Sequence, residues 1–270
     1  MAPSERSDLP VGGPAGASAA AAMKDFEPST LWRISAFEQA RLAGKLHGDR
    51  DDRPTLLPTT LLADLQQLRR DPTNDDVLEV IAACVRNKEA ALLYLQHGNN
   101  VWPVTLFPRA EVYHSPRDAS QMAGAGMGTL RVIAAEPPGV KPPGDAMHER
   151  IARGDRYHPL PGLLWAVALQ GPRTGLLTEI SGRVAYRLVS SADPKDMPSS
   201  LGALSSAVGR LRNEAASLRD VAGWPGLSIE RASRLLNALY LTGSLMVSRS
   251  HPAARSEPRG WRGWLGRGRR

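Results

Sequence analysis

Three side chains near the C-terminus have types and spacing suited to reading base edges in DNA. Arg231, Arg234 and Asn237 follow one another at intervals of three residues, so they share one exposed face if residues 229–242 form a helix. Arginine can bind guanine, and asparagine adenine, through paired hydrogen bonds in the major groove. Arg249, on a short strand expected after this helix, completes the candidate contacts.

The charge around this helix favours a different partner. DNA-binding units gain much of their affinity by neutralising phosphates, but the arginines that flank the helix are offset by Glu214, Asp220 and Glu230. Two hypotheses stay open: a helix that reads DNA, and a solvated face on a unit that binds protein. The weak local charge favours the second.

The C-terminal tail, residues 253–270, is the other candidate contact segment. It carries six arginines and one acidic residue, which leaves a net charge of +2 for the other 252 residues. Arginines with interleaved tryptophans suit single-stranded nucleic acid, an anionic membrane surface or an acidic protein, and the alternative is a disordered, solubilising end. The candidate contacts in the tail are Arg259, Trp261, Arg262, Trp264, Arg267, Arg269 and Arg270.

Residue types that serve catalysis or metal binding lack the neighbours that such sites need. A phosphate loop at Gly124–Gly128 would require a preceding strand and a following helix, but a polar loop is expected before it and a strand after it. The six histidines include no pair four residues apart, as a helical zinc site would need. Cys84 lies on an apolar helix stripe, where a buried small hydrophobe is expected. We therefore expect no enzyme, cofactor, metal or small-molecule substrate.

The first half of the chain predicts an α+β domain at 29–136, after a disordered Ala-, Gly- and Pro-rich segment at 1–28. Helices are expected at 30–46, at 60–70 and from Val77 onward, the last capped by Asn74 or Asp75. Strands at 91–96 and 101–107 flank a glycine turn and predict a hairpin. Pro103 places the second of these strands at a sheet edge. Further strands are expected at 112–114 and 129–135.

The second half repeats the order of helix and hairpin after a Pro- and Gly-rich linker at 137–158. In the domain at 159–252, we expect a helix at 160–169, strands at 176–180 and 183–189, and a helix at 201–211. Segments 77–107 and 161–190 share a helix, paired leucines and a glycine turn, which indicates either an internal repeat or convergence. Residues 218–250 predict a winged-helix-like helix-turn-helix, with Ser228 as N-cap and no return strand for the wing.

Residues 160–190 resemble the start of a PATAN domain, the module of bacterial response-regulator and gliding-motility proteins. The resemblance lies in the helix LPGLLWAVAL, in Arg173, Thr174 and Gly175 before LLTEI, and in the glycine turn with an aromatic at Tyr186. PATAN-like chains also tend to continue into helices of helix-turn-helix character. The resemblance implies an adaptor that holds signalling partners, and it implies no catalytic residue.

These patterns together predict an α+β protein with disordered termini, acting as a bacterial adaptor or regulator through protein contacts in signalling or motility. The alternative is a nucleic-acid-binding regulator that uses residues 218–249 and the basic tail, and the tail also leaves an anionic membrane surface as a partner. A single cysteine fits a reducing compartment. No apolar run approaches the roughly 18 residues that span a bilayer, so a cytoplasmic location is expected.

Overall fold

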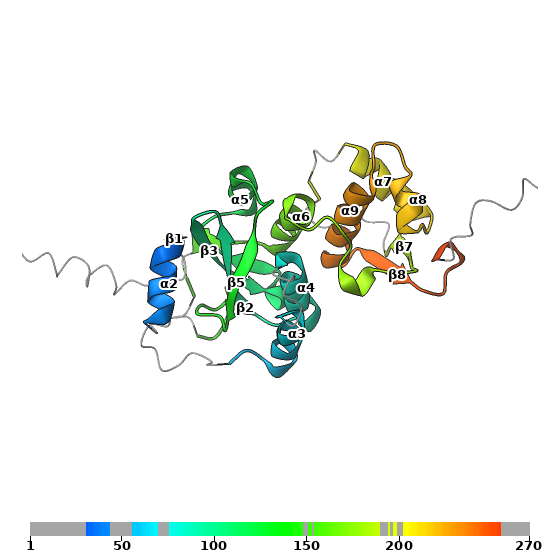
Figure 1. Ribbon diagram of the computed structural model, residues 1–270. Helices are drawn as coiled ribbons and strands as arrows, with labels where there is room; N and C mark the ends of the chain where they lie inside the picture. The colour runs from blue at the N-terminus through cyan, green and yellow to red at the C-terminus, as the bar shows by residue number, and fades with distance from the viewer. Residues whose placement is uncertain are drawn as a thin grey trace, which may run out of the picture.

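The computed structural model describes residues 31–43, 56–69, 76–147, 151–152, 154–189, 194, 197–198 and 202–254. Over these residues the chain is α+β, as predicted. Figure 1 shows two lobes, one built around a sheet and the other around three helices and two strands. Of the segments expected to be disordered, 1–28 and 253–270, the first and residues 255–270 lie outside the described residues. Residues 253 and 254 belong to a 3₁₀ turn at Pro252–Ala254, so the predicted tail began two residues too early. No helix in the described part is both long enough and apolar enough to cross a bilayer.

The larger sheet is antiparallel and has the strand order β5-β2-β3-β4-β6, with β1 pairing to β3 beside β4. The predicted hairpin is confirmed, and His97 pairs with Asn100 across a turn in which Gly98 has a φ of 55°. Glycine adopts this left-handed conformation without steric cost. The strands are Trp32–Arg33 (β1), Ala91–His97 (β2), Asn100–Phe107 (β3), Val112–His114 (β4), Arg131–Glu136 (β5) and Tyr157–Pro159 (β6).

Pro103 does not mark a sheet edge, because β3 lies in the middle of the sheet. One side of β3 is shared by two short strands: β1 pairs with Asn100 and Val101, and β4 pairs with residues 105–107. Pro103 lies in the gap between these pairings, so its missing N–H removes no hydrogen bond to either strand. The edge prediction was wrong for this reason.

Helices cover both faces of the sheet, and the hydrophobic cluster on one face is much larger than the cluster on the other. One face packs against α3, α4 and α6 in the main hydrophobic core. The other carries a small cluster in which Phe37 of α2 contacts Tyr94, with ring centroids 4.8 Å apart. The helices of this lobe are Ile34–Leu42 (α2), Thr59–Arg69 (α3), Val77–Asn87 (α4), Ala119–Ala125 (α5) and Leu160–Gln170 (α6).

Two local expectations in this lobe are corrected. The N-cap of α4 is Asp76 rather than Asn74 or Asp75, and its Oδ1 accepts a hydrogen bond from the Leu78 N–H at 2.9 Å. The polar loop expected at 115–121, before Gly124–Gly128, is irregular only to Asp118, and its last three residues begin the helix α5, because Asp118 and Gln121 form a capping box there. The strand expected after these glycines is confirmed as β5.

The second lobe contains α7, α8 and α9 with the strand pair β7–β8. The predicted helices and final strand are confirmed as Ala203–Asn213 (α7), Leu218–Ala222 (α8), Ile229–Leu241 (α9) and Leu245–Ser248 (β8). β8 pairs with Ala185–Leu188 (β7), which precedes all three helices, and Tyr186 of β7 also bridges to Ala216. The strand after α9 is thus paired with a strand from upstream.

The strand predicted at 176–180 was wrong. Residues 171–181 form an irregular segment with one 3₁₀ turn at Thr178–Ile180, and we call this segment the connection. The backbone N–H groups of Leu177 and Thr178 bind side chains from helices instead of a neighbouring strand. Segment 161–190 therefore lacks the hairpin that 77–107 contains, and the hypothesis of an internal repeat loses its structural basis.

The two halves of the chain share one core. Ile81 and Trp102 from the first half belong to the same cluster of buried side chains as Leu163 and Leu235 from the second. The segment expected to be a linker at 137–158 also takes part, because β6 begins at Tyr157 and pairs with β4. The sheet therefore extends beyond residue 136, and α6 follows it directly.

Candidate interaction surfaces

Helix α9, which the sequence singled out as a candidate reader of DNA, is buried along most of its length. Every residue from Ala232 to Leu241 is buried or half-buried, because the helix contacts α8 and α6. In Figure 1, α9 lies between these two helices. Asn237 is 0% exposed, so the prediction that it lies on an exposed face was wrong.

The polar side chains of α9 hold the backbone around the connection. Asn237 accepts a hydrogen bond from the Leu177 N–H and donates one to the Gly175 carbonyl, both at 2.9 Å. Arg234 donates to the carbonyls of Leu169 and Gly171, at 2.6 and 2.9 Å. The Asn237 amide therefore satisfies peptide groups that a neighbouring strand would otherwise satisfy.

The connection is also fastened to α4 by a group of charged side chains. Arg173 pairs with Asp76 and with Glu79, the latter at 2.9 Å, and all three side chains are at most 17% exposed. Glu79 also accepts hydrogen bonds from the Thr178 N–H and hydroxyl, each at 2.8 Å. Charges at such depth are stable only when they are paired and hydrogen-bonded, as these are. Sequence reasoning missed this cluster, because Arg173 and Glu79 are far apart in the chain.

A second charged group joins α3, α4, the connection and α9 nearer the surface. Arg86 donates to Asp64 and to Glu179, both at 2.7 Å. The hydrogen bonds from Arg86 and Asn87 lower the pKa of Asp64. Burial, followed by the negative charge of Glu179, raises the pKa of Tyr240 on α9 to about 12. Arg86 bridges the two carboxylates, so this group fastens α3 and α4 to the connection.

The remaining predicted contact residues are scattered. Arg231 is exposed, and its guanidinium donates to the Gly226 carbonyl at 2.6 Å, within the turn before α9. Arg249 lies 3.5 Å from the Glu179 carbonyl. The tail candidates Arg259, Trp261, Arg262, Trp264, Arg267, Arg269 and Arg270 lie outside the described residues. The structure therefore does not bring Arg231, Arg234, Asn237 and Arg249 together on one surface.

No protein family, curated protein or solved structure matches this chain. Its surfaces are therefore interpreted from their own geometry.

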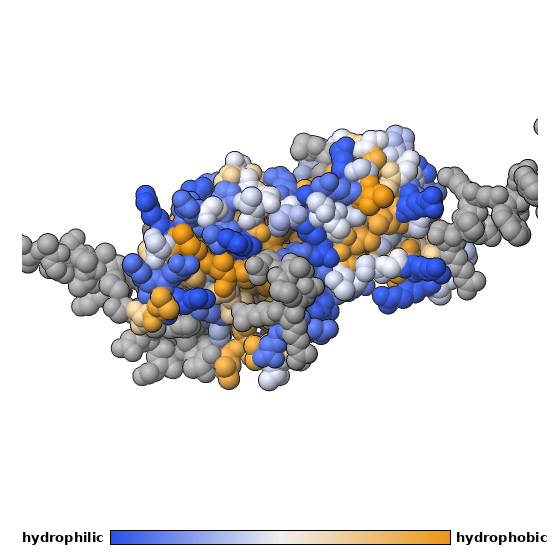
Figure 2. Space-filling view, in the orientation of Figure 1, coloured by the Kyte–Doolittle hydropathy of each residue, from blue (hydrophilic) through white to orange (hydrophobic). Residues whose placement is uncertain are grey.

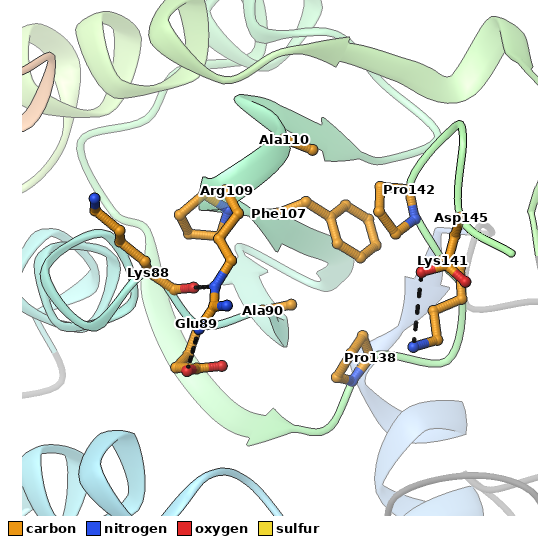
Figure 3. Close-up of a pocket in the computed structure, with 11 residues that line it drawn as sticks. Lys88, Glu89, Ala90, Phe107, Arg109, Ala110, Pro138, Lys141, Pro142 and Asp145 are labelled. Atoms are coloured by element: carbon orange, nitrogen blue, oxygen red, sulfur yellow. Dashed lines mark hydrogen bonds and ion pairs between the residues drawn. The ribbon is translucent and has the colours of Figure 1, made fainter.

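A shallow pocket of about 170 Å³ lies where the end of α4 meets the end of β3 and the segment 138–145 (Figure 3). Four of its five charged side chains are paired, Arg109 with Glu89 at 2.9 Å and Lys141 with Asp145 at 4.0 Å, and the fifth is Lys88. Pockets for small ligands typically measure about 300–1,000 Å³. Within the described residues, no group of His, Cys, Asp or Glu side chains is placed to hold a metal ion.

Strand β5 forms an edge of the sheet, which is a different kind of surface from the pocket. It is the last strand of the sheet path and pairs with β2 alone among the described strands. Its residues from Val132 to Glu136 are half-buried, and Figure 2 shows apolar surface over this part of the sheet lobe. Another strand can bind to the backbone of such an edge.

Proposed function

We propose that this protein is a non-enzymatic bacterial adaptor or regulator that acts in the cytoplasm through protein–protein contacts, in signalling or motility. The observation that carries the proposal is that polar side chains of α9 form hydrogen bonds inside the protein. Arg234 and Asn237 hold the backbone around the connection, so reading base edges with them would first require breaking these bonds. The resemblance of residues 160–190 to PATAN domains suggests the same class.

The surface proposed for the partner is the open edge of β5. An extended segment of a partner protein can add a strand to such an edge, with main-chain hydrogen bonds giving affinity and alternate side chains giving specificity. The half-buried side chains of Val132 and Ile133 would then lose more of their contact with water, which favours association.

Photo-crosslinking in cells tests this surface. A photoreactive residue replaces Arg131, which is exposed at the start of β5, or Ser206, which is exposed on α7. We expect a discrete crosslinked product from position 131 that is absent from position 206. The partner, identified by mass spectrometry and purified, should then bind the unmodified protein. Identical crosslinking patterns at the two positions would refute the β5 edge as the docking surface.

The competing function is nucleic-acid-binding regulation by residues 218–249 and the basic tail. Fluorescence anisotropy of duplex DNA, measured with the full chain and with a chain ending at Ala254, distinguishes this function from the adaptor function. We expect no binding by the shortened chain. If it binds, and loses about 10³-fold or more in affinity between low and physiological salt as proteins with many phosphate contacts do, the adaptor proposal fails and α9 must rearrange to reach DNA.

A further inference from the structure

Strand β5 carries opposite charges at its two ends. It begins at Arg131 and ends at Glu136, and the four residues between them are uncharged. Five residue steps along a strand span about 16 Å, which is too far for these two side chains to pair within one chain. Two antiparallel strands place the start of one beside the end of the other. A second copy of β5 would therefore meet each of the two charges with its opposite.

A β-bulge in β5 brings the two charged side chains to the same face of the sheet. In a regular strand, residues five apart point to opposite faces. Here Ile133 is the extra residue of a bulge, because the residues on either side of it, Val132 and Ala134, pair with neighbouring residues of β2. Arg131 and Glu136 therefore pair with residues of β2 that are four apart. They share one face and the same place in the alternation of hydrogen bonds.

The packing of β5 gives its two faces an order that is symmetric about the centre of the strand. Ile133 and Ala134, at the centre, pack against the smaller hydrophobic cluster of the sheet. Val132 and Ala135, which flank them, pack against the main core on the other face. The charged residues at both ends lie on the face of the smaller cluster, since the β2 partner of one of them, Leu92, belongs to it.

This symmetry selects one register for a second copy. Residues that lie opposite each other in an antiparallel pair point to the same face of the sheet. With Arg131 opposite Glu136 of the second copy, each of the six residues of β5 lies opposite a residue of its own face. Every other antiparallel register that pairs four or more residues of β5 puts residues of different faces opposite each other.

We propose that the β5 edge of the free protein pairs in this register with a second copy of the chain. The product is a two-fold symmetric dimer whose sheet is continuous across the interface. Main-chain hydrogen bonds join the two strands, an Arg131–Glu136 pair closes each end, and half-buried side chains such as Val132 lose more of their contact with water.

The dimer regulates the edge to which the partner is assigned, and in this respect the inference rests on the proposed function. A partner segment reaches β5 only by displacing the second copy. To compete with it, the segment must offer an acidic side chain opposite Arg131 and a basic one opposite Glu136, because like charges opposite each other are unfavourable.

Sedimentation velocity of the purified full chain over a range of concentrations tests the dimer. We expect the mass to rise from the 29.1 kDa of one chain toward twice that value. Arg131→Glu replaces two attractive contacts per dimer by two repulsive ones, so the Kd of the dimer should increase about tenfold or more. The double variant Arg131→Glu/Glu136→Arg restores opposite charges across the interface and should recover most of this loss.

The recovery is specific to contact between two copies. The charge swap does not rebuild the internal bond from Arg131 to Gln96. The matched control is Arg187→Glu, which reverses an exposed strand arginine of the other lobe and should leave the Kd unchanged, and circular dichroism should show that all variants are folded. A single-chain mass at every concentration, equal Kd values for Arg131→Glu and the control, or a double variant no better than Arg131→Glu would each overturn the proposal.

The dimer and the adaptor function can fail separately. Dimerisation is measured on purified protein without a partner, whereas docking is judged by crosslinking in cells. A crosslink between two copies has twice the mass of one chain, so it is distinguished from a crosslink to another protein. Crosslinks to other proteins combined with a single-chain mass in sedimentation would overturn the dimer and keep the adaptor function. Crosslinks only between copies would support the dimer and contradict docking of a partner at β5.

Discussion

Replacing Asn237 by alanine distinguishes a structural role for this side chain from a role in DNA contact. The amide is fully buried and joins α9 to the connection through the Leu177 N–H and the Gly175 carbonyl. Alanine keeps the helix intact but removes both bonds. The expected result is a loss of stability that no exposed asparagine would cause.

The size of the loss can be worked out from the two partners. Leu177 is buried, so its N–H would remain unpaired away from water, at a cost of about 1–3 kcal/mol. Gly175 is exposed, so water can replace the bond to its carbonyl, and the net cost is about 0.5–1 kcal/mol. The sum of about 1.5–4 kcal/mol corresponds to a lower Tm of about 3–16 °C for a chain of this size.

Thermal unfolding followed by circular dichroism measures this difference, with Asn213→Ala as the control. Asn213 ends α7 and is exposed, and among the described residues it donates only to the Gly209 carbonyl, at 3.3 Å. Its replacement should change stability by less than about 0.5 kcal/mol, as is usual for surface positions. If the two variants melted at the same temperature, Asn237 would not fasten the connection, and its burial against Leu177 and Gly175 would have to be reconsidered.

Three further outcomes follow from the same structure. Arg173→Met should destabilise the fold by about 3–5 kcal/mol, because Glu79 is left as a buried, uncompensated charge; adding Glu79→Gln should recover part of this in a urea double-mutant cycle. Gly226→Ala should cost more than Gly243→Ala in thermal melts, because both have positive φ but only at Gly226 would a new Cβ meet another side chain, at 2.7 Å. Burial raises the pKa of Tyr186 to about 12, so its stabilising contribution is complete below about pH 10 and is lost as the pH rises toward 12; Tyr186→Phe should remove that part of the pH dependence of the urea midpoint.

The elements of this fold could be predicted wherever their formation depends on local pattern. The apolar spacing from Val77 gave α4, the glycine turn at 98–100 gave the β2–β3 hairpin, and Ser228 gave the start of α9. Each of these signals lies within a few residues of the element that it defines. Burial of Cys84 followed from the same helical stripe and is confirmed.

The contacts between those elements in the folded protein could not be predicted in the same way. The residues at 176–180 have a strand-like pattern, but Glu79, Arg173 and Asn237 satisfy their backbone in an irregular form. These partners lie between three and 99 residues away in the chain. A pattern within a few residues cannot predict the distant ones. Likewise, α9 has the amphipathic sequence of a half-exposed helix, and the burial of Asn237 depends on the connection, which is bonded to it from 60 residues away in the chain.

The pairing of β7 with β8 has a consequence for how this chain is made. Leu188 pairs with Leu245, so β7 leaves the ribosome well before its partner exists. At synthesis rates of about 5–20 residues per second, the wait is roughly 3–11 s, far longer than the microseconds in which a local hairpin closes. During that interval the inner side chains of β7 have no strand to pair with, and the second lobe cannot complete its sheet until nearly the whole described chain has been synthesised.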